Sequence, residues 1–318
     1  MSVRIVVGDV RHRLSGLADR SIECCVTSPP YFGLRDYGVD GQIGLEDTPA
    51  AFVAELVGVF REVRRVLRDD GTLWLNLGDS YWTAKGASMG ADPKQGARRG
   101  WSRPQDRPPP DGLKPKDLIG IPWRVAFALQ EDGWYLRSDI IWHKPNPMPE
   151  SVTDRPTSAH EHIFLLTKSP RYFYDADAIR EPHETGERKG DRRSYSPGSS
   201  SSHRLDGGHE AQTGSFAGLP LNEAGRNARN VWTIATRPYS EAHFATFPPD
   251  LAERCIKAGC PVGGTVLDPF GGAGTTGLVA DRLQRNAVLI ELNPAYAEMA
   301  RARIASESGM FSSVEVAA

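Results

Sequence analysis

A glycine-rich stretch near the end of the chain constrains the fold more than any other feature. The run Gly264-Thr-Val-Leu-Asp-Pro-Phe-Gly-Gly-Ala-Gly-Thr-Thr-Gly277 begins as an apolar strand, turns, and continues through Leu278 to Leu283 with a helical pattern. A second apolar run, Ala287-Val-Leu-Ile, then ends at Glu291. The pattern predicts a buried strand, a tight turn, a helix and a second buried strand, which is one βαβ unit.

The glycine spacing predicts the kind of ligand that this unit binds. Gly272, Gly274 and Gly277 have the G-x-G-x-x-G spacing, and Glu291 follows where an acid meets the hydroxyls of a ribose. The turn is therefore predicted to bind a nucleotide-like cofactor. By itself the pattern also fits a nicotinamide-dependent oxidoreductase.

The position of the unit in the chain restricts the topology. Only 27 residues follow Glu291, enough for the helix that Asn293 and Pro294 open and little more. A nucleotide-binding sheet needs several parallel strands, so the others must come from upstream. We therefore expect the cofactor unit to close a sheet begun at the N-terminus, in permuted order.

The N-terminal part supplies two further strands with polar residues at their ends. Val3 to Val7 runs into Gly8-Asp9, and Ser21 to Thr27 runs into Ser28-Pro-Pro-Tyr31. Two consecutive prolines continue neither a strand ladder nor a helix, so they form a rigid extended corner. Open α/β sheets bind ligands at the carboxyl ends of their strands, which places both segments near the site.

The middle of the chain predicts the rest of the sheet and its covering helices. A helix begins at Thr48-Pro49, carries an apolar stripe from Phe52 to Leu67 and is stopped by Gly71. The remaining predicted elements are a core strand at 72–77, a helix at 118–130, strands at 134–142 and 162–167, and a short helix at 251–258. The two strands have no helix-length connection, so we expect an antiparallel pair at the edge of the sheet.

Two long stretches lack periodicity. Residues 83–115 carry seven basic and three acidic residues, which fits either a mobile solvated loop or a basic arm that meets phosphates. Residues 178–229 are rich in Ser, Gly and Arg and are too long for a plain turn. Both are interpreted as insertions into a compact scaffold.

Composition restricts the setting of the protein. The formal charge is −2, so a polyanion site must be a local patch. The sequence shows no secretory signal and no apolar run of membrane-spanning length, which indicates a cytoplasmic protein. The four cysteines, Cys24, Cys25, Cys255 and Cys260, form no C-x-x-C pair, so neither a disulfide framework nor a metal site is expected.

Two motifs together resemble a known family. Thr27-Ser-Pro-Pro-Tyr31 is similar to the catalytic motif, in its serine form, of the DNA amino-methyltransferases, and Leu267-Asp-Pro-Phe-Gly-Gly-Ala-Gly-Thr-Thr276 resembles their cofactor motif. The order, catalytic motif first, resembles the family's beta arrangement. The resemblance covers residues 3–82, 116–176 and 229–305 and implies an α/β, Rossmann-like methyltransferase fold with a mixed, mostly parallel sheet.

The resemblance also implies a division of the chain. Residues 1–82 form a catalytic half, 83–117 a basic flexible insertion and 118–177 the sheet-edge strands. Residues 178–228 form a target-recognition insertion, 229–308 a cofactor-binding half and 309–318 a tail. Double-stranded DNA is the implied partner. A cognate restriction endonuclease, the oligomeric state and the recognition sequence stay open.

The implied reaction is methylation of an exocyclic base nitrogen from S-adenosylmethionine. That nitrogen is a poor nucleophile, because its lone pair is delocalised into the ring, and acceptors placed against its hydrogens favour attack. The Ser28 hydroxyl and Pro29 carbonyl, held by the corner with Pro30, are the expected acceptors. A stacked base must be flipped out at about a few kcal/mol, and stacking on Tyr31 returns about 1–3 kcal/mol. We expect direct transfer without a covalent intermediate.

The resemblance assigns the cofactor to several residues. Asp268 would meet the amino group of the methionine moiety, and Glu291 would bind the ribose hydroxyls. The remaining expected cofactor residues are Asp9, Phe244, Thr246, Phe247, Pro269, Phe270, Gly272, Gly274 and Thr275. Arg98, Arg99 and Arg103 are expected to bind DNA phosphates.

The target base and the reaction class leave alternatives. Ser28 stands where adenine-modifying relatives more often have Asp or Asn, which favours cytosine N4 over adenine N6. The alternatives are a nicotinamide oxidoreductase, a non-catalytic DNA-binding module, and a methyltransferase acting on RNA or on a protein glutamine. His143 and His162 are left without a role.

Overall fold

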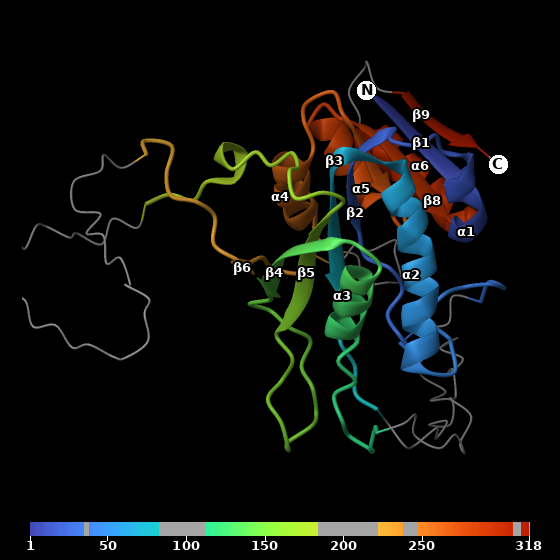
Figure 1. Cartoon of the computed structure of the whole chain (residues 1–318), viewed down its shortest axis with the longest axis vertical. Helices are drawn as coiled ribbons and strands as arrows, with labels where there is room; N and C mark the ends of the chain where they lie inside the picture. Colours follow the sequence, from blue (N-terminus) through green and yellow to red (C-terminus); the bar gives the residue numbers. More distant parts are fainter. Residues whose placement is uncertain (35–37, 83–111, 184–221, 238–246, 308–312, 318) are drawn as a thin grey trace, which may run out of the picture.

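The computed structural model describes residues 1–34, 38–82, 112–183, 222–237, 247–307 and 313–317. These residues form one nine-stranded sheet in the order β6-β4-β5-β3-β2-β7-β8-β1-β9 (Figure 1). In that order the strands are Val231–Thr233, Tyr135–His143, His160–Thr167, Leu67–Leu77, Ile22–Thr27, Thr265–Asp268, Asn286–Glu291, Ser2–Val7 and Ser313–Ala317. Within the described sheet, only β5 runs against its two neighbours. The mixed, mostly parallel sheet that the sequence predicts is confirmed.

Helices cover both faces of the sheet and divide the core in two. On one face lie α1 (Val10–Arg13), α2 (Pro49–Val66) and α3 (Ile121–Glu131). The other face is covered by α4 (Pro249–Gly259), α5 (Thr275–Arg282) and α6 (Pro294–Glu307). Successive side chains of β2 point to opposite faces of the sheet. Cys25 packs in the core under α1, α2 and α3, and Cys24 packs in the core under α4, α5 and α6. All four cysteines are free and buried.

Helix α2 shows how local sequence sets an element. The Thr48 hydroxyl accepts the N–H of Ala51 at 3.1 Å, and Pro49 occupies the first turn. The apolar stripe is buried along the helix. The predicted end at Gly71 is wrong, since the helix ends at Val66 and Gly71 lies inside β3. The chain passes directly from helix to strand without a glycine cap.

The connections place a topological switch point between β2 and β7. From β2 the chain crosses one face through α2 to β3, and from β7 it crosses the other face through α5 to β8. The two βαβ units therefore lead away from each other on opposite sides. In such sheets the crevice at the carboxyl ends of the two diverging strands binds the ligand.

Two edge strands were not predicted. The β4–β5 pair is antiparallel as expected, but it does not form the edge, because β6 pairs in parallel outside β4. At the opposite edge β9 pairs in parallel with β1, within the segment predicted to be a tail. Both strands are at most five residues long and mostly exposed, so neither carries a clear apolar pattern.

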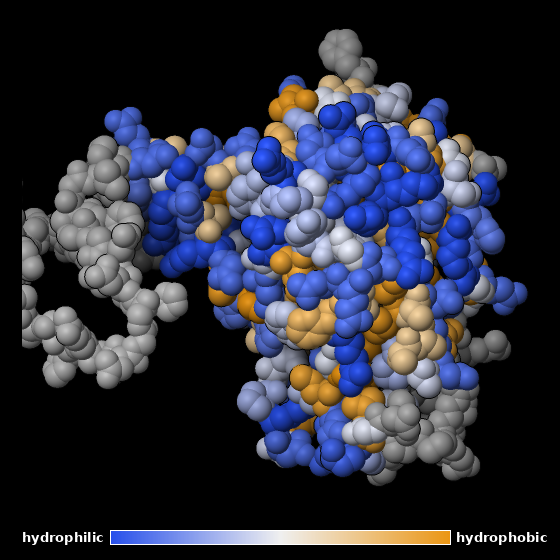
Figure 2. All heavy atoms as spheres, viewed as in Figure 1, coloured by the Kyte–Doolittle hydropathy of each residue, from blue (hydrophilic) through white to orange (hydrophobic). Residues whose placement is uncertain are grey.

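The surface that carries α2 and α3 is mostly hydrophilic, with apolar side chains gathered over its lower middle (Figure 2). Trp123 and Phe127 are the exposed large apolar residues of α3, and their rings lie 5.4 Å apart. Among the described residues, no helix combines the length and apolar character required to cross a bilayer.

Candidate active site

The two motifs meet at the switch point. Thr27 ends β2 and Asp268 ends β7, and these strands pair in parallel. The Thr27 hydroxyl donates to Asp268 Oδ1 at 2.7 Å, although the two residues are 241 positions apart. The Thr276 hydroxyl, from the first turn of α5, donates to Oδ2 at 2.7 Å. The diproline corner and the glycine turn therefore leave the sheet from neighbouring strand ends.

Asp268 is the buried centre of this junction. Only 1% of the residue is exposed, and its carboxylate also accepts the N–H of Phe270 at 3.1 Å. Burial raises the pKa of Asp268 above 3.8, while the hydroxyls of Thr276 and Thr27 oppose that rise. Three donors leave about one of the roughly four acceptor positions of the carboxylate.

The glycines of the turn differ in what they allow. Gly272 has φ +49°, and a Cβ there would meet nothing nearer than Phe270 O at 3.9 Å. Gly274 has φ +75°, and its Cβ would lie 2.9 Å from the Cβ of Ala300 on α6. Gly272 therefore leaves open space beside the backbone, whereas Gly274 permits close packing of α5 against α6.

The predicted cofactor residues of the glycine turn differ in burial. Pro269 and Thr275 are buried, while Phe270 and Gly272 are partly exposed. Arg303 of α6 donates to the carbonyl of Ala273 at 3.0 Å and to the Thr275 hydroxyl at 3.1 Å. The turn is thus held from behind by α6 and keeps Phe270 and Gly272 toward solvent.

Glu291 lies at the end of β8, beside the same turn. Its Oε2 accepts the N–H of Gly272 and its Oε1 the N–H of Asn293, both at 2.8 Å. Burial raises the pKa of Glu291 above 4.5, and the two backbone donors oppose that rise. Each carboxylate oxygen still has acceptor capacity for one further donor.

The Ser-Pro-Pro-Tyr corner leaves β2 beside this turn. Pro29 is buried, while Ser28 and Tyr31 are half-buried. The Ser28 hydroxyl lies 3.4 Å from the phenol oxygen of Tyr31. A Cβ at Gly44 would lie 3.2 Å from the Tyr31 carbonyl and 3.3 Å from the Pro30 Cβ, so the following loop packs closely on the corner.

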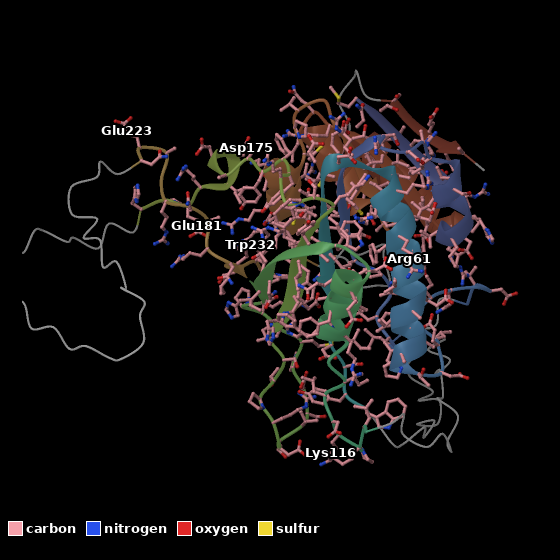
Figure 3. The ribbon with its side chains drawn as sticks, in the orientation of Figure 1. Arg61, Lys116, Asp175, Glu181, Glu223 and Trp232 are labelled. Carbon is pink, nitrogen blue, oxygen red and sulfur yellow. The ribbon has the colours of Figure 1, made fainter. Side chains whose placement is uncertain are left out.

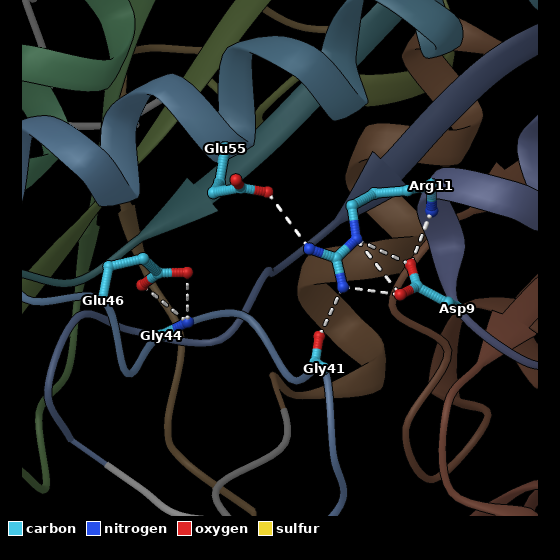
Figure 4. A network of polar contacts seen from close by, with 6 residues as sticks. All are labelled: Asp9, Arg11, Gly41, Gly44, Glu46 and Glu55. Atoms are coloured by element: carbon cyan, nitrogen blue, oxygen red, sulfur yellow. Dashed lines mark hydrogen bonds and ion pairs between the residues drawn. The ribbon is translucent and has the colours of Figure 1, made fainter.

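Asp9 is engaged by the protein itself. Its side chain caps α1 and forms an ion pair at 2.5 Å with Arg11 (Figure 4). The hydrogen bond from Arg11 is the main cause that lowers the pKa of Asp9. Arg11 also donates to the carbonyl of Gly41 at 2.7 Å and pairs with Glu55 at 3.3 Å. The predicted cofactor contact of Asp9 therefore competes with a role in anchoring the loop that follows Tyr31.

Three polar residues of the site were missed from the sequence. Two of them, Glu161 and Asn76, contact the Tyr31 phenol, and the third, Lys144, forms an ion pair with Glu161. Glu161 is the second residue of β5, Asn76 lies near the end of β3, and Lys144 follows β4. An available signal was the predicted antiparallel pair, which brings the start of the second strand to the edge where the first one ends. This pairing could have indicated that the charged residues at those two ends, Lys144 and Glu161, are neighbours.

Several predicted residues lie outside the described ranges. These are Phe244, Thr246, Arg98, Arg99 and Arg103. Phe247 is described and packs, partly buried, against the cluster on the α4 side of the sheet. Within the described part of the chain, no three His, Cys, Asp or Glu side chains are grouped so that they could hold a metal ion.

The ends of the second predicted insertion are held together beside β6. Glu181 and Arg226 exchange backbone hydrogen bonds of 2.9 and 2.8 Å, and Glu181 pairs with Arg229 at 3.1 Å. Figure 3 shows Glu181 and Trp232 where this segment leaves the sheet. Arg254 of α4 lies over the Trp232 ring at 5.2 Å. These contacts join the two described ends of the insertion to each other.

The doubly wound sheet, with its glycine turn and diproline corner at one switch point, defines a Rossmann-like methyltransferase. The model of the N6_N4_Mtase family, described as DNA methylase, matches residues 22–302, so the chain belongs to this family. It is therefore a DNA methyltransferase. The family assignment also excludes the nicotinamide oxidoreductase that the glycine spacing left open.

Individual relatives agree with the family assignment. The type II methyltransferase M.SmaI from Serratia marcescens is 49% identical over 303 residues, which cover 95% of this chain and 91% of that protein. The putative DNA modification methylase TTHA0409 from Thermus thermophilus, solved in complex with S-adenosyl-L-methionine, has 26% identity and a TM-score of 0.61, covering 99% of this chain and 100% of its own. PvuII DNA methyltransferase, described as cytosine-N4-specific, has a TM-score of 0.60 at 19% identity over 94% and 86% of the two chains, and this likeness concerns the fold.

Proposed function

We propose that the protein transfers a methyl group from S-adenosylmethionine directly to the exocyclic N4 of a cytosine flipped out of double-stranded DNA. The observation that carries this proposal is the hydrogen bond from Thr27 to Asp268, which joins the catalytic corner to the cofactor turn. A methyl donor and an acceptor base bound at these two segments lie at adjoining strand ends. Proximity of this kind is a main source of rate enhancement in group transfer.

The residues present fit the proposed cofactor. Glu291 has a free acceptor position on each oxygen for the two ribose hydroxyls, and Asp268 retains about one acceptor position for the ammonium group. The open space at Gly272 permits close approach of a ligand to the backbone. S-adenosylmethionine, when bound, supplies an electrophilic methyl group on a sulfonium. Support from a relative comes from TTHA0409, which was solved with this cofactor.

The corner residues act on the amino group of the base. The Ser28 hydroxyl and the Pro29 carbonyl accept its two hydrogens, which favours a pyramidal nitrogen with an available lone pair. Because Pro29 and Pro30 restrict the backbone, these acceptors need little reorganisation during the reaction. The Tyr31 ring stacks on the flipped base and returns about 1–3 kcal/mol of the cost of unstacking.

Cytosine N4 is proposed as the target because the motif carries serine at position 28. Adenine-modifying relatives more often have Asp or Asn there, so adenine N6 is the alternative. The similarity to a type II methyltransferase supports a role in a restriction-modification system with a partner endonuclease. Sequence recognition is proposed for the segment at 178–228, whose ends are fixed beside β6.

The test is incubation with labelled S-adenosylmethionine and mixed-sequence duplex DNA, followed by nucleoside analysis. We expect N4-methylcytosine from the wild type and little product from Ser28→Ala or Tyr31→Ala. Ser15→Ala and Tyr135→Ala, at exposed positions of η1 (Leu14–Gly16) and β4, serve as matched controls. N6-methyladenine would select the alternative base. Absence of product with the wild type, or full activity of both corner variants, would contradict the proposal.

A further inference from the structure

The Tyr31 phenol is bound by side chains that belong to neither motif. Its O–H donates to Glu161 Oε2 at 2.6 Å, and Asn76 Oδ1 lies 3.3 Å from the same oxygen. Asn76 Nδ2 also donates to Glu161 Oε2 at 3.0 Å and to the His162 carbonyl at 3.2 Å. The Glu161 carboxylate therefore accepts a hydrogen bond from the Tyr31 phenol and is itself oriented by the side-chain amide of Asn76.

The sheet topology brings Glu161 to this place. Because β5 runs antiparallel to β3, its first residues lie at the edge where β2 and β3 end. Asn76 is next to the last residue of β3 and pairs with Ile163 across the ladder. A parallel strand in the position of β5 would begin at the far end of the sheet. The single reversed strand of the described sheet thus supplies the carboxylate.

A neighbouring cation balances the charge of Glu161. Lys144 forms an ion pair with Glu161 Oε1 and lies 4.4 Å from the centroid of the Trp142 ring. The side chains of Lys144 and Glu161 are only 18% and 14% exposed. Few water molecules can therefore replace either partner, and the pair holds Glu161 in one position toward Tyr31.

The other side of the Tyr31 ring contacts the backbone just after β3. A Cβ at Gly78 would lie 2.6 Å from the ring carbon Cε2 and 3.1 Å from Cδ2. The ring edge is thus fixed by Gly78, and its oxygen by Glu161. A rotation of the ring away from this position would break the phenol contact.

We infer that Glu161 is a positioning residue for methyl transfer, which fixes the plane of the Tyr31 ring and is held in turn by Lys144 and Asn76. This inference rests on the proposed function, in which the Tyr31 ring carries the flipped base. The plane of the ring sets the plane of the stacked base. That plane decides whether the amino nitrogen faces the acceptors of the corner and the methyl donor.

The expected effect concerns turnover rather than cofactor affinity. In Glu161→Gln, one acceptor oxygen becomes an amide that donates, so either the Lys144 contact or the contacts to Tyr31 and Asn76 are lost. Misplacement of a reacting group by about 1 Å can cost about a hundredfold in rate, so we expect kcat to fall by about ten- to a hundredfold. The dissociation constant for S-adenosylmethionine, measured by calorimetry, should not change.

A double-mutant cycle separates positioning of Tyr31 from a general structural role. Tyr31→Phe, Glu161→Gln and the double variant are compared for kcat on plasmid DNA from a host without the enzyme. If Glu161 acts through the phenol, the double variant is about as slow as the slower single variant. The matched control is Glu253→Gln, which removes a carboxylate paired with Lys257 on α4. It should leave kcat at the wild-type level.

A second cycle covers the case in which Glu161→Gln does not fold. Lys144→Met removes the cation that holds the carboxylate, and it should lower kcat in the wild type but not further in Tyr31→Phe. Multiplicative losses in these cycles, with an active wild type, would overturn the role assigned to Glu161. Failure of the wild type to methylate any DNA would instead overturn the proposed function.

Discussion

The junction between the two motifs gives a sharp test of the structure through the variant Thr27→Val. Valine keeps the shape of threonine but lacks the hydroxyl that donates to Asp268 at 2.7 Å. Thr27 is fully buried and Asp268 is 1% exposed, so water cannot replace the lost donor. A hydrogen bond to a charged group contributes about 1.5–3 kcal/mol, and we expect a loss of this size in the free energy of unfolding.

The matched control is Thr167→Val. Thr167 is equally buried, but its hydroxyl donates to the neutral carbonyl of Ser169 at 2.8 Å. A neutral hydrogen bond contributes about 0.5–1.5 kcal/mol, so this variant should lose less stability. Urea unfolding followed by tryptophan fluorescence measures both variants. An equal loss in the two variants would refute a charged acceptor at Asp268.

The pH dependence provides a second check on the same variant. Burial raises the pKa of Asp268 above 3.8, so its contribution to stability is present below that value and is lost as the pH rises through the raised pKa. Loss of the Thr27 hydroxyl raises this pKa further. The stability difference between wild type and Thr27→Val should therefore be small near pH 3.8 and grow as the pH increases. A difference independent of pH would contradict the reasoning.

Three further predictions concern other parts of the site. Gly274→Ala should lower the free energy of unfolding by about 1–3 kcal/mol, because the new methyl group would meet Ala300 and the residue has φ +75°. Thermal unfolding measures the loss, and the control Gly16→Ala, which has open space and no positive φ, should change little. Gly78→Ala should lower kcat with unchanged cofactor affinity, since its methyl group would displace the Tyr31 ring, and Gly58→Ala on α2 is the control with open space. Glu291→Gln should weaken cofactor binding in calorimetry by about 1.5–3 kcal/mol. In the wild type the pKa of Glu291 is raised above 4.5, so affinity should fall as the pH decreases through that raised value, and a flat profile would argue against the ribose contact.

The sequence by itself determined the local elements and the two motifs. The glycine unit, the diproline corner and the start of α2 depend on turn chemistry, capping and apolar periodicity, which act over a few residues. These features were sufficient for the fold class and for the expectation that the sheet is permuted. Short exposed strands such as β6 and β9 lack such a pattern, and partners elsewhere in the chain decided whether they formed.

Only the tertiary structure decided which side chains meet. The pairing of β2 with β7 joins Thr27 to Asp268 across 241 positions and turns that carboxylate inward. The reversal of β5 brings Glu161 to Tyr31, and no spacing in the sequence marks that contact. The physical reason is that a strand's neighbours are chosen by burial of whole apolar faces, a long-range balance that residues near in sequence do not encode.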